Sequence, residues 1–475
     1  MNPWILLMGC IHSSPPSSEA TDTLGPRPEV VTPDDFQPVP PETLTLASGA
    51  DLWLQVRDDI PLVSLALVIP GGSSTDPADQ PGLTSLTDTL LLHGAGDRDA
   101  TTFAAESEQQ ALELDVVTTR NVTLVTLDAK SDRLDIGLDL LADVVLRPTF
   151  AAEEIERVRV LRLGDIVQDL DDPRVLASHE ANRLYFGDGH PLAHPSSGTQ
   201  QGIEAIERSQ ILSSWSDRFV PTGATFVVTG DFDPQQLHEK LDQRFSDWQD
   251  RKDIEHGSIP APGALEGEDG PRFYLVEKPG STQSVLHVLM PGPTHMDPES
   301  VPSKLGIIAL GGTFTSRLNQ LLREEKGYTY GARSWPDSIG EHGMIHASSA
   351  VRADVTAPAL QDLMGELTRI QAGIDAAELE KGKGAVRTRT ISALESRQGT
   401  VGALVQMQIQ GSGPNGLEDE LDSVQDASLE QVNQALATMR LDQAIVVVVA
   451  DPSVAEDLPE LTPLPGATLP TGDQP

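Results

Sequence analysis

Histidine is the side chain best suited to hold a catalytic metal, so the eleven histidines of the 475-residue chain are the first candidates for chemistry. Two spacings on one helix, H-x-x-E-H and H-E-x-x-H, place two imidazoles four residues apart with a glutamate as general base. Neither spacing occurs. His190 and His194 are four apart in GHPLAHP, but Pro191 and Pro195 predict a loop, and structural or exposed histidines are expected there.

The single cysteine, Cys10, cannot form an internal disulfide, and its setting predicts another chemistry. Residues 1–9 read MNPWILLMG, and the stretch LMGC resembles a bacterial lipobox, in which the cysteine is lipidated. A segment rich in serine and proline follows and suits a flexible tether. We expect a lipoprotein signal at 1–10 and a disordered tether at 11–41; the alternative is a disordered N-terminus with an incidental cysteine.

Composition excludes one class of partner. Lys plus Arg is 33 and Asp plus Glu is 72, so the formal net charge is −39. Binding to nucleic acid needs clustered positive charge, and binding to anionic lipid through a basic patch needs it as well. We therefore expect no nucleic-acid partner, and membrane contact through the lipid anchor only. The charge is interpreted mainly as a solvated acidic surface.

The chain contains an internal repeat with a period of about 220 residues. Pro70-Gly71, Asp76-Pro77 and Pro81 recur at one constant offset as Pro291-Gly292, Asp297-Pro298 and Pro302. A second pair of segments agrees, because Asp231 in TFVVTGDFDP and Asp451 in IVVVVADP are separated by almost the same offset. Two matches at nearly one offset indicate a duplicated domain of about 200 residues.

Each half shows strands first, then a helix, further strands, long amphipathic helices and a closing buried strand. The expected strands and helices of the two halves are 44–56, 62–69, 82–92, 112–128, 131–146, 152–168 and 226–230, and 273–276, 283–290, 302–310, 343–350, 356–372, 376–410 and 445–450. This order predicts an α+β fold of two homologous domains, each a mainly antiparallel sheet with helices on one face. The expected domains are 42–250 and 272–453, with a linker at 251–271 and a disordered tail at 454–475.

The loop PGGSSTDP before a helix that begins at Gly82-Leu83, within duplicated α+β halves of this size, resembles the insulinase/pitrilysin-type (inverzincin) metallopeptidases. The resemblance runs from about Leu44 to Asp451 and implies the fold of the mitochondrial processing peptidase. In that family the first helix carries H-x-x-E-H, with two zinc ligands and the general base. A third ligand, a glutamate, lies on a later helix.

At the positions of this motif the chain departs from the family. Ser85 and Thr89 stand where the two histidines are expected, and Asp88 stands at the base position. Asp165, on the helix expected at 152–168, stands near the position of the third ligand. Hydroxyls are poor zinc ligands, so we expect no metal bound by this chain. Asp88 and Asp165 could form a weak site for a hard cation, or they could be solvated or capping carboxylates, which we favour.

The second half retains a segment that resembles the family more closely, LGGTFTSRLNQLLREEKGYTYGARS at residues 310–334. In the family an arginine and a tyrosine seven residues apart reach from this segment toward the zinc site of the other half; here these are Arg323 and Tyr330. Arginine can hold a peptide carbonyl, and tyrosine can donate to the developing oxyanion. The other interpretation is an exposed helix end, with Arg323 paired to Glu324, and an edge-strand tyrosine.

The resemblance therefore implies a subunit without zinc that supplies Arg323 and Tyr330 to a homologous partner, which carries the zinc and cleaves a peptide substrate. Two alternatives stay open: a purely structural or peptide-binding lipoprotein, and an autonomous metallopeptidase with atypical ligands. The lipobox predicts the periplasmic side of a bacterial cell envelope. Ile11 after Cys10 is not the aspartate that retains lipoproteins at the inner membrane, so we expect the outer membrane.

Overall fold

The computed structural model describes residues 36–250, 259, 270–458 and 462–464. Cys10, the predicted signal and most of the predicted tether and linker lie outside these residues. The described chain from Val39 onward belongs to one structural unit. Within the described ranges, no helix has the length and apolar character that a membrane span requires.

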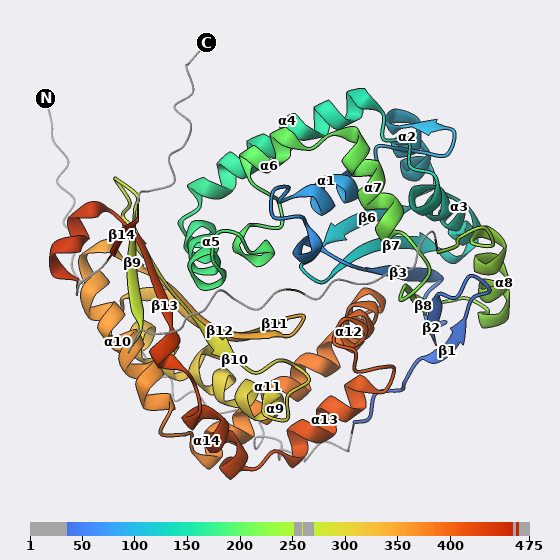
Figure 1. The fold of residues 1–475 in the computed structure, drawn as a ribbon. Helices are drawn as coiled ribbons and strands as arrows, with labels where there is room; N and C mark the ends of the chain where they lie inside the picture. Colours follow the sequence, from blue (N-terminus) through green and yellow to red (C-terminus); the bar gives the residue numbers. More distant parts are fainter. Residues whose placement is uncertain (1–35, 251–258, 260–269, 459–461, 465–475) are drawn as a thin grey trace, which may run out of the picture. The chain divides into compact units, whose positions relative to one another are not determined.

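The first half contains the predicted strands and helices in the predicted order, and it also has helices at 100–109 and between 173 and 244 that were not predicted (Figure 1). Its strands are β1 (Glu42–Thr45), β2 (Asp51–Val56), β3 (Leu62–Pro70), β4 (Gly94–Ala95), β5 (Arg98–Asp99), β6 (Glu113–Thr118), β7 (Val122–Lys130) and β8 (Thr225–Gly230). Its helices are α1 (Leu83–Leu90), α2 (Ala100–Gln109), α3 (Leu134–Leu146), α4 (Ala152–Asp171), α5 (Pro173–Phe186), α6 (Gln200–Ala205), α7 (Arg208–Arg218) and α8 (Pro234–Arg244), with short turns η1 (Ser73–Thr75), η2 (Ser131–Arg133) and η3 (Pro191–Ala193).

The second half repeats this order from β9 onward. Its strands are β9 (Arg272–Glu277), β10 (Gln283–Gly292), β11 (Thr329–Ile339), β12 (His342–Arg352), β13 (Ile445–Ala450) and β14 (Thr462–Leu464). Its helices are α9 (Ser300–Ile307), α10 (Thr356–Ile370), α11 (Ala376–Leu394), α12 (Arg397–Ile409), α13 (Gly416–Asp426) and α14 (Leu429–Ala437), with the π-helices η4 (Ile308–Gly312) and η5 (Asn319–Glu325) and the short turns η6 (Ala353–Val355), η7 (Leu441–Gln443) and η8 (Pro452–Asp457).

The two large sheets have equivalent strand orders. The first is β1-β2-β8-β3-β7-β6, and the second, written from its other edge, is β14-β9-β13-β10-β12-β11. Strand β8 is parallel to β2, strand β9 is parallel to β13 and β14, and the remaining pairs are antiparallel. The predicted α+β fold of two homologous, mainly antiparallel domains is therefore confirmed. β6 and β11 are edge strands in equivalent positions.

Each central strand is apolar on both faces because both faces are covered. In β3, Leu65 and Leu67 point into the core that the sheet shares with the helices of its own half. Ala66 and Val68 point to the opposite face, where Leu404 of α12 packs. The sequence predicted helices on one face of each sheet, and the structure adds a helix from the other half on the second face.

Each half contributes one helix that packs on the sheet of the other half, and we call this the exchange of helices. Helix α5 of the first half packs on β10 and β13, where Leu176 joins a cluster with Val285 and Val447. Helix α12 of the second half packs on β3 and β8, where Leu404 joins Trp53. The two helices begin at nearly equivalent positions of the repeat. The two halves therefore share their hydrophobic cores.

Two expectations about the second half were wrong in detail. The single helix expected at 376–410 is divided into α11 and α12, because the side chain of Ser396 caps a new N-terminus by accepting from the backbone N–H of Gly399. In the tail expected to be disordered, β14 pairs in parallel with β9, and Leu464 packs against the cluster around α5. A short hydrophobic strand can complete a sheet edge even within a proline-rich stretch.

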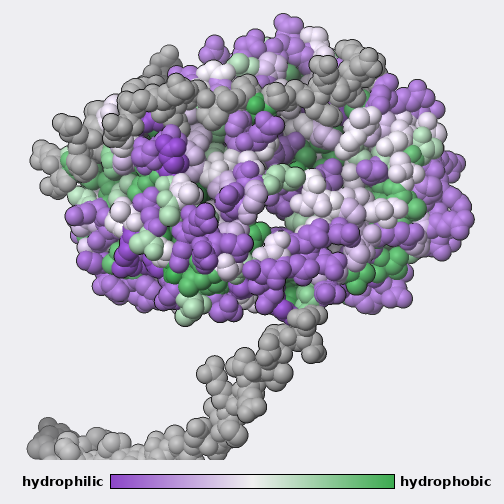
Figure 2. Space-filling model, turned by 60° about the horizontal axis from the view of Figure 1, so that its bottom comes forward, coloured by the Kyte–Doolittle hydropathy of each residue, from purple (hydrophilic) through white to green (hydrophobic). Residues whose placement is uncertain are grey.

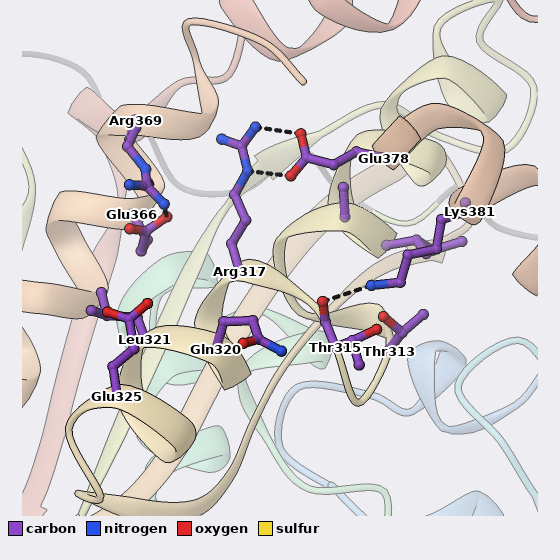
Figure 3. Close-up of a pocket in the computed structure, with 13 residues that line it drawn as sticks. Thr313, Thr315, Arg317, Gln320, Leu321, Glu325, Glu366, Arg369, Glu378 and Lys381 are labelled. Carbon is purple, nitrogen blue, oxygen red and sulfur yellow. Dashed lines mark hydrogen bonds and ion pairs between the residues drawn. The ribbon is translucent and has the colours of Figure 1, made fainter. Parts of the chain in front are cut away.

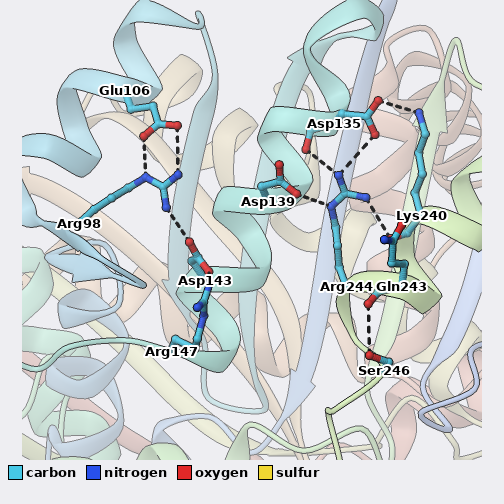
Figure 4. A network of polar contacts seen from close by, with 10 residues as sticks. All are labelled: Arg98, Glu106, Asp135, Asp139, Asp143, Arg147, Lys240, Gln243, Arg244 and Ser246. Atoms are coloured by element: carbon cyan, nitrogen blue, oxygen red, sulfur yellow. Dashed lines mark hydrogen bonds and ion pairs between the residues drawn. The ribbon is translucent and has the colours of Figure 1, made fainter.

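Ion pairs hold the outer helices of the first half together (Figure 4). Arg98 beside α2 donates to Glu106 and, at 2.6 Å, to Asp143 of α3. Arg244 of α8 donates to Asp139 of α3 at 2.7 Å. Asp143 is the buried member of this set, with 6% exposure, so its pairing matters most for stability. The face that Figure 2 shows is largely hydrophilic, with hydrophobic residues in separate patches.

Candidate functional site

Helix α1 is positioned by the loop that precedes it. The buried carboxylate of Asp76 accepts hydrogen bonds of 2.8 Å from the backbone N–H groups of Gly82 and Thr84, at the start of the helix. Burial raises the pKa of Asp76, and these hydrogen bonds partly oppose the rise. Gly82 has φ +97°, and a Cβ atom there would lie 2.7 Å from the Cα of Gly198. The loop that carries the family resemblance thus fixes α1 against its neighbours.

The two positions of the missing histidines, Ser85 and Thr89, are bound by one arginine. Arg162 of α4 donates 2.8 Å hydrogen bonds from Nη1 to the Oγ of Ser85 and from Nη2 to the Oγ1 of Thr89. The two hydroxyls lie on the same face of α1, one helical turn apart, and the forked guanidinium donates one hydrogen bond to each. A zinc ion bound by these residues would have to displace a guanidinium, so the residues present do not fit the metal.

Asp88, at the position of the general base, is also fully engaged. Its Oδ1 accepts a 2.6 Å hydrogen bond from Arg218 of α7, and its Oδ2 accepts from Thr118 at 2.7 Å and Thr123 at 2.6 Å. The side chains of Asp88 and Arg218 are only 1% and 10% exposed. A carboxylate with three donors in a buried salt bridge is a structural group.

The weak cation site considered for Asp88 and Asp165 is not formed. Asp165 is exposed on α4, whereas Asp88 is buried and paired with Arg218. Within the described ranges, no group of three or more His, Cys, Asp or Glu side chains is arranged to hold a metal ion. The structure therefore brings Ser85, Asp88 and Thr89 together with two arginines and places Asp165 at an exposed position of α4.

Histidines near this region have structural surroundings. His190 stacks on Phe186, with ring centroids 4.8 Å apart, and its Nδ1 accepts from the backbone N–H of Leu192. His93 contacts Arg157 at 2.8 Å. These positions agree with the loop interpretation of GHPLAHP, because His190 lies beside η3 and not on a longer helix.

Arg323 and Tyr330 lie in the second half on either side of Gly327. Arg323 belongs to η5, and its guanidinium carbon lies 4.1 Å from the ring centroid of Phe314. Its Nε is 3.4 Å from the carboxylate of Glu324. Tyr330, near the start of edge strand β11, is 92% exposed, and Phe314 is 61% exposed. Tyr330 and Phe314 are both exposed and Arg323 stacks on Phe314, so this segment carries accessible polar and aromatic groups.

Two glycines in the segment at residues 310–334 have backbone positions that favour glycine. Gly327 has φ +63° and follows the end of η5. Gly311 lies inside the π-helix η4. A Cβ atom at Gly311 would lie 2.4 Å from the backbone nitrogen of Ser334, so glycine is required there by the close approach of β11.

Behind the segment lies a pocket of about 200 Å³ (Figure 3). Arg317 points toward Glu378 of α11 and donates two hydrogen bonds of 2.6 Å to its carboxylate. Lys381 donates at 2.6 Å to the backbone oxygen of Thr315. These contacts anchor the chain between Thr313 and Glu325 to α11 and thereby support Arg323.

The residues around Asp88 and the residues around Arg323 form two separate sets in this chain. The polar contacts of Arg323 among the described residues are with Glu324 and Phe314, and none joins it to Asp88. Arg162 and Arg218 were missed by sequence reasoning. A signal for Arg162 existed, because it shares the helix face of Val158 and Ile166, both buried, where an apolar side chain is expected.

Solved structures with the same fold are numerous. A structure described as a peptidase M16 inactive domain from Pseudomonas fluorescens aligns with a TM-score of 0.79 at 24% identity, covering 86% of this chain and 98% of that one. A protease from Helicobacter pylori aligns with the same TM-score at 19% identity, covering 87% and 100%. The periplasmic protease PqqL from Escherichia coli aligns with a TM-score of 0.71 at 14% identity, covering 94% of this chain and 49% of that one.

Sequence relatives agree with these structures. A protein named uncharacterized zinc protease from Mycobacterium leprae is 27% identical over 412 residues, covering 86% of this chain and 91% of that protein. One with the same description from Bacillus subtilis is 21% identical over 418 residues, covering 86% and 98%. Residues 54–181 match the model of the insulinase family (peptidase family M16), and residues 205–386 match the model of the M16 inactive domain. Since these two models together match well over half of the sequence, the chain belongs to the insulinase family of peptidases, M16.

Proposed function

We propose that this chain is the subunit without zinc of an insulinase-family peptidase. In this proposal a homologous partner with an intact H-x-x-E-H motif supplies the metal and the general base. This chain supplies Arg323, Tyr330 and part of the wall that binds the peptide. The observation that carries the proposal is the occupation of the metal-ligand positions Ser85 and Thr89 by Arg162.

The chemistry assigned to the second half follows from its exposed groups. Hydrolysis of a peptide bond develops negative charge on the carbonyl oxygen, and donors directed at that charge lower the barrier. The phenol of Tyr330 is 92% exposed and can donate one hydrogen bond to a substrate held by another subunit. The guanidinium of Arg323 can hold a neighbouring carbonyl, with its position fixed by the ring of Phe314.

The comparisons support a pairing of two units of this size. The protease PqqL is about twice as long as the part that this chain covers, and its first half alone is also similar, with a TM-score of 0.72. Several relatives are named zinc proteases. A peptidase assembled from two chains with divided roles would use one member with the metal and one without it.

The place of action is part of the proposal. Cys10 and the apolar residues before it favour a lipid-anchored subunit on the periplasmic side of a bacterial envelope, in the outer membrane. Radiolabelled palmitate incorporation into the full chain, and its loss in Cys10→Ser, tests the anchor. An unlabelled full chain would contradict it.

The experiment that tests the catalytic role is cleavage of a quenched fluorescent peptide library. The chain from Val39 onward is assayed alone, with a homologue from the same genome that carries H-x-x-E-H, and with that homologue plus Arg323→Ala. We expect no cleavage by the chain alone, cleavage by the mixture, and a loss of about 10²–10³-fold in kcat with Arg323→Ala. Arg440→Ala, an exposed arginine of the same half paired with Asp442, is the matched control.

Three results would contradict the proposal. Chelator-sensitive cleavage by the pure chain would favour an autonomous metallopeptidase with atypical ligands. Equal cleavage with and without this chain would leave a structural or peptide-binding role. Equal effects of Arg323→Ala and Arg440→Ala would remove the specific role of Arg323.

A further inference from the structure

Arg162 carries a positive charge that no described carboxylate neutralises directly. Its two hydrogen bonds go to neutral hydroxyls, those of Ser85 and Thr89. In contrast, Arg218 in the same region is paired with Asp88 at 2.6 Å. Burial lowers the pKa of Arg162, and the more distant charges of Asp165 and Asp169 oppose this effect. A half-buried cation bound only to hydroxyls retains donors for another ligand.

Helix α1, which accepts the two hydrogen bonds of Arg162, packs against an open sheet edge. A guanidinium has five N–H donors, and two of the donors of Arg162 are used by α1. Helix α1 packs against β6, and Thr118 at the end of β6 donates to Asp88 of α1 at 2.7 Å. Strand β6 pairs with β7 on one side only. An extended peptide that adds to the edge of β6 would pass beside α1, to which Arg162 is hydrogen-bonded.

The local charge selects the kind of ligand. Around Arg162 the carboxylates of Asp88, Asp165 and Asp169 outnumber the two guanidinium groups, those of Arg162 and Arg218. The pKa of Asp169 is raised by burial and by the charge of Asp165, which shows that negative charge is already crowded. These carboxylates would repel a carboxylate of a ligand. A neutral carbonyl oxygen accepts a hydrogen bond from Arg162 without adding charge.

We propose that Arg162 turns the former metal position of this half into a binding site for a backbone carbonyl of an extended peptide, which is held there and not cleaved. The inference rests on the proposed function, in which this chain forms part of the peptide-binding wall. Arg162 holds the carbonyl in place of a metal, and Ser85 and Thr89 orient the guanidinium. No water is activated, because Asp88 is occupied by Arg218 and two threonines.

Fluorescence anisotropy with the chain from Val39 onward, without any partner, tests this site. The probe is an unstructured, fluorescein-labelled peptide with an amidated C-terminus and no free carboxylates. Arg162→Met is expected to weaken binding by about 10-fold to 100-fold, the effect of losing one charge-assisted hydrogen bond. Arg157→Met on the same helix is the matched control, since Arg157 is paired with Glu154 on the outer side. A probe N-methylated at alternate residues cannot pair with β6 and is expected to bind weakly.

A second variant keeps the test decisive if Arg162→Met does not fold, as judged by its thermal unfolding. Ser85→Ala combined with Thr89→Ala retains the charge but removes the acceptors that orient it, and a several-fold loss of affinity is expected. Unchanged affinity in a folded Arg162→Met variant, or in the double variant, would overturn the inference. Absence of binding by the unmodified chain would also overturn it. The proposed function is judged separately, by the effect of Arg323→Ala on cleavage in the mixture.

Discussion

The guanidinium of Arg218 donates a 2.6 Å hydrogen bond to the carboxylate of Asp88, and the two side chains are 10% and 1% exposed. Asp88 stands at the position that the sequence resemblance assigns to the family's general base. In this chain the same position is a buried salt bridge that ties α1 to α7. The group that would activate water in a peptidase has become part of the internal support of the fold.

Removal of one member of this pair is therefore expected to destabilise the chain strongly. Arg218→Met leaves the carboxylate of Asp88 buried without its cation and should lower the free energy of unfolding by about 3–5 kcal/mol. The exposed pair Arg440–Asp442 provides the control, because Arg440→Met should cost less than about 1 kcal/mol. Urea unfolding followed by circular dichroism measures both. Equal losses of unfolding free energy in the two variants would show that the buried pair stabilises the chain no more than the exposed pair does.

The hydrogen bonds of Arg162 to Ser85 and Thr89 predict how zinc binding can be introduced. Ser85→His combined with Thr89→His supplies two imidazoles, but the guanidinium of Arg162 still occupies the space between them. We expect stoichiometric zinc only when Arg162→Glu is added, because it exchanges the cation for a third ligand. Metal content after dialysis, measured by plasma mass spectrometry, distinguishes the variants. Full zinc occupancy with Arg162 retained would contradict the steric and electrostatic role given to this residue.

The shared cores predict that the halves depend on one another. Leu404 of α12 is 1% exposed and packs against Trp53 and Val227 of the first sheet. Leu404→Ala should lower the free energy of unfolding by about 2–5 kcal/mol, whereas Leu161→Ala, at a position 55% exposed, should change it little. Near-ultraviolet signals of Trp53 should be lost together with the far-ultraviolet signal. An intact first half after loss of α12 packing would contradict the shared core.

A buried histidine pair predicts a loss of stability in acid. His287 and His346 contact one another at 3.2 Å, and burial lowers their pKa values to about 3 and about 4. Both lie below the ordinary value of 6.5 for an unfolded chain, so the unfolded state binds protons first as the pH falls. The contribution is complete above about pH 6.5 and is lost progressively toward pH 4, by roughly 3 kcal/mol for His346.

Unfolding by urea at a series of pH values from 7 to 4 measures this slope. His346→Gln should reduce the slope by about one proton, since only one of the two buried imidazoles then remains to be protonated. His238, which is partly exposed on α8, is a suitable control position. An unchanged slope in His346→Gln would show that other groups determine the acid sensitivity.

Much of the fold could be predicted from the sequence because local residue patterns specify it. The offset from Pro70-Gly71 to Pro291-Gly292 revealed the duplication, and the apolar runs of β8 and β13 marked the buried closing strands. The exchange of α5 and α12 was not accessible, because a helix pattern says which face is apolar but not which sheet covers it. The break at Ser396 was missed because the sequence pattern continues through it.

The candidate site was accessible only in part. Ser85, Asp88 and Thr89 followed from the motif window, but their partners did not. Arg162 is 77 residues from Ser85, and Arg218 is 130 residues from Asp88. No local spacing connects such residues, so only the packing of α4 and α7 against α1 shows that guanidinium groups contact Ser85, Asp88 and Thr89.

The division of labour between the two subunits is tested most directly by the kcat of the reconstituted pair with Tyr330→Phe in this chain. The substitution removes one hydroxyl from a side chain that is 92% exposed, so it leaves the fold intact. A fall in kcat of about 10²–10³-fold with little change in KM is the predicted result, because the phenol acts on charge that develops only in the transition state. An unchanged kcat, in a mixture whose activity requires this chain, would contradict a catalytic role for Tyr330.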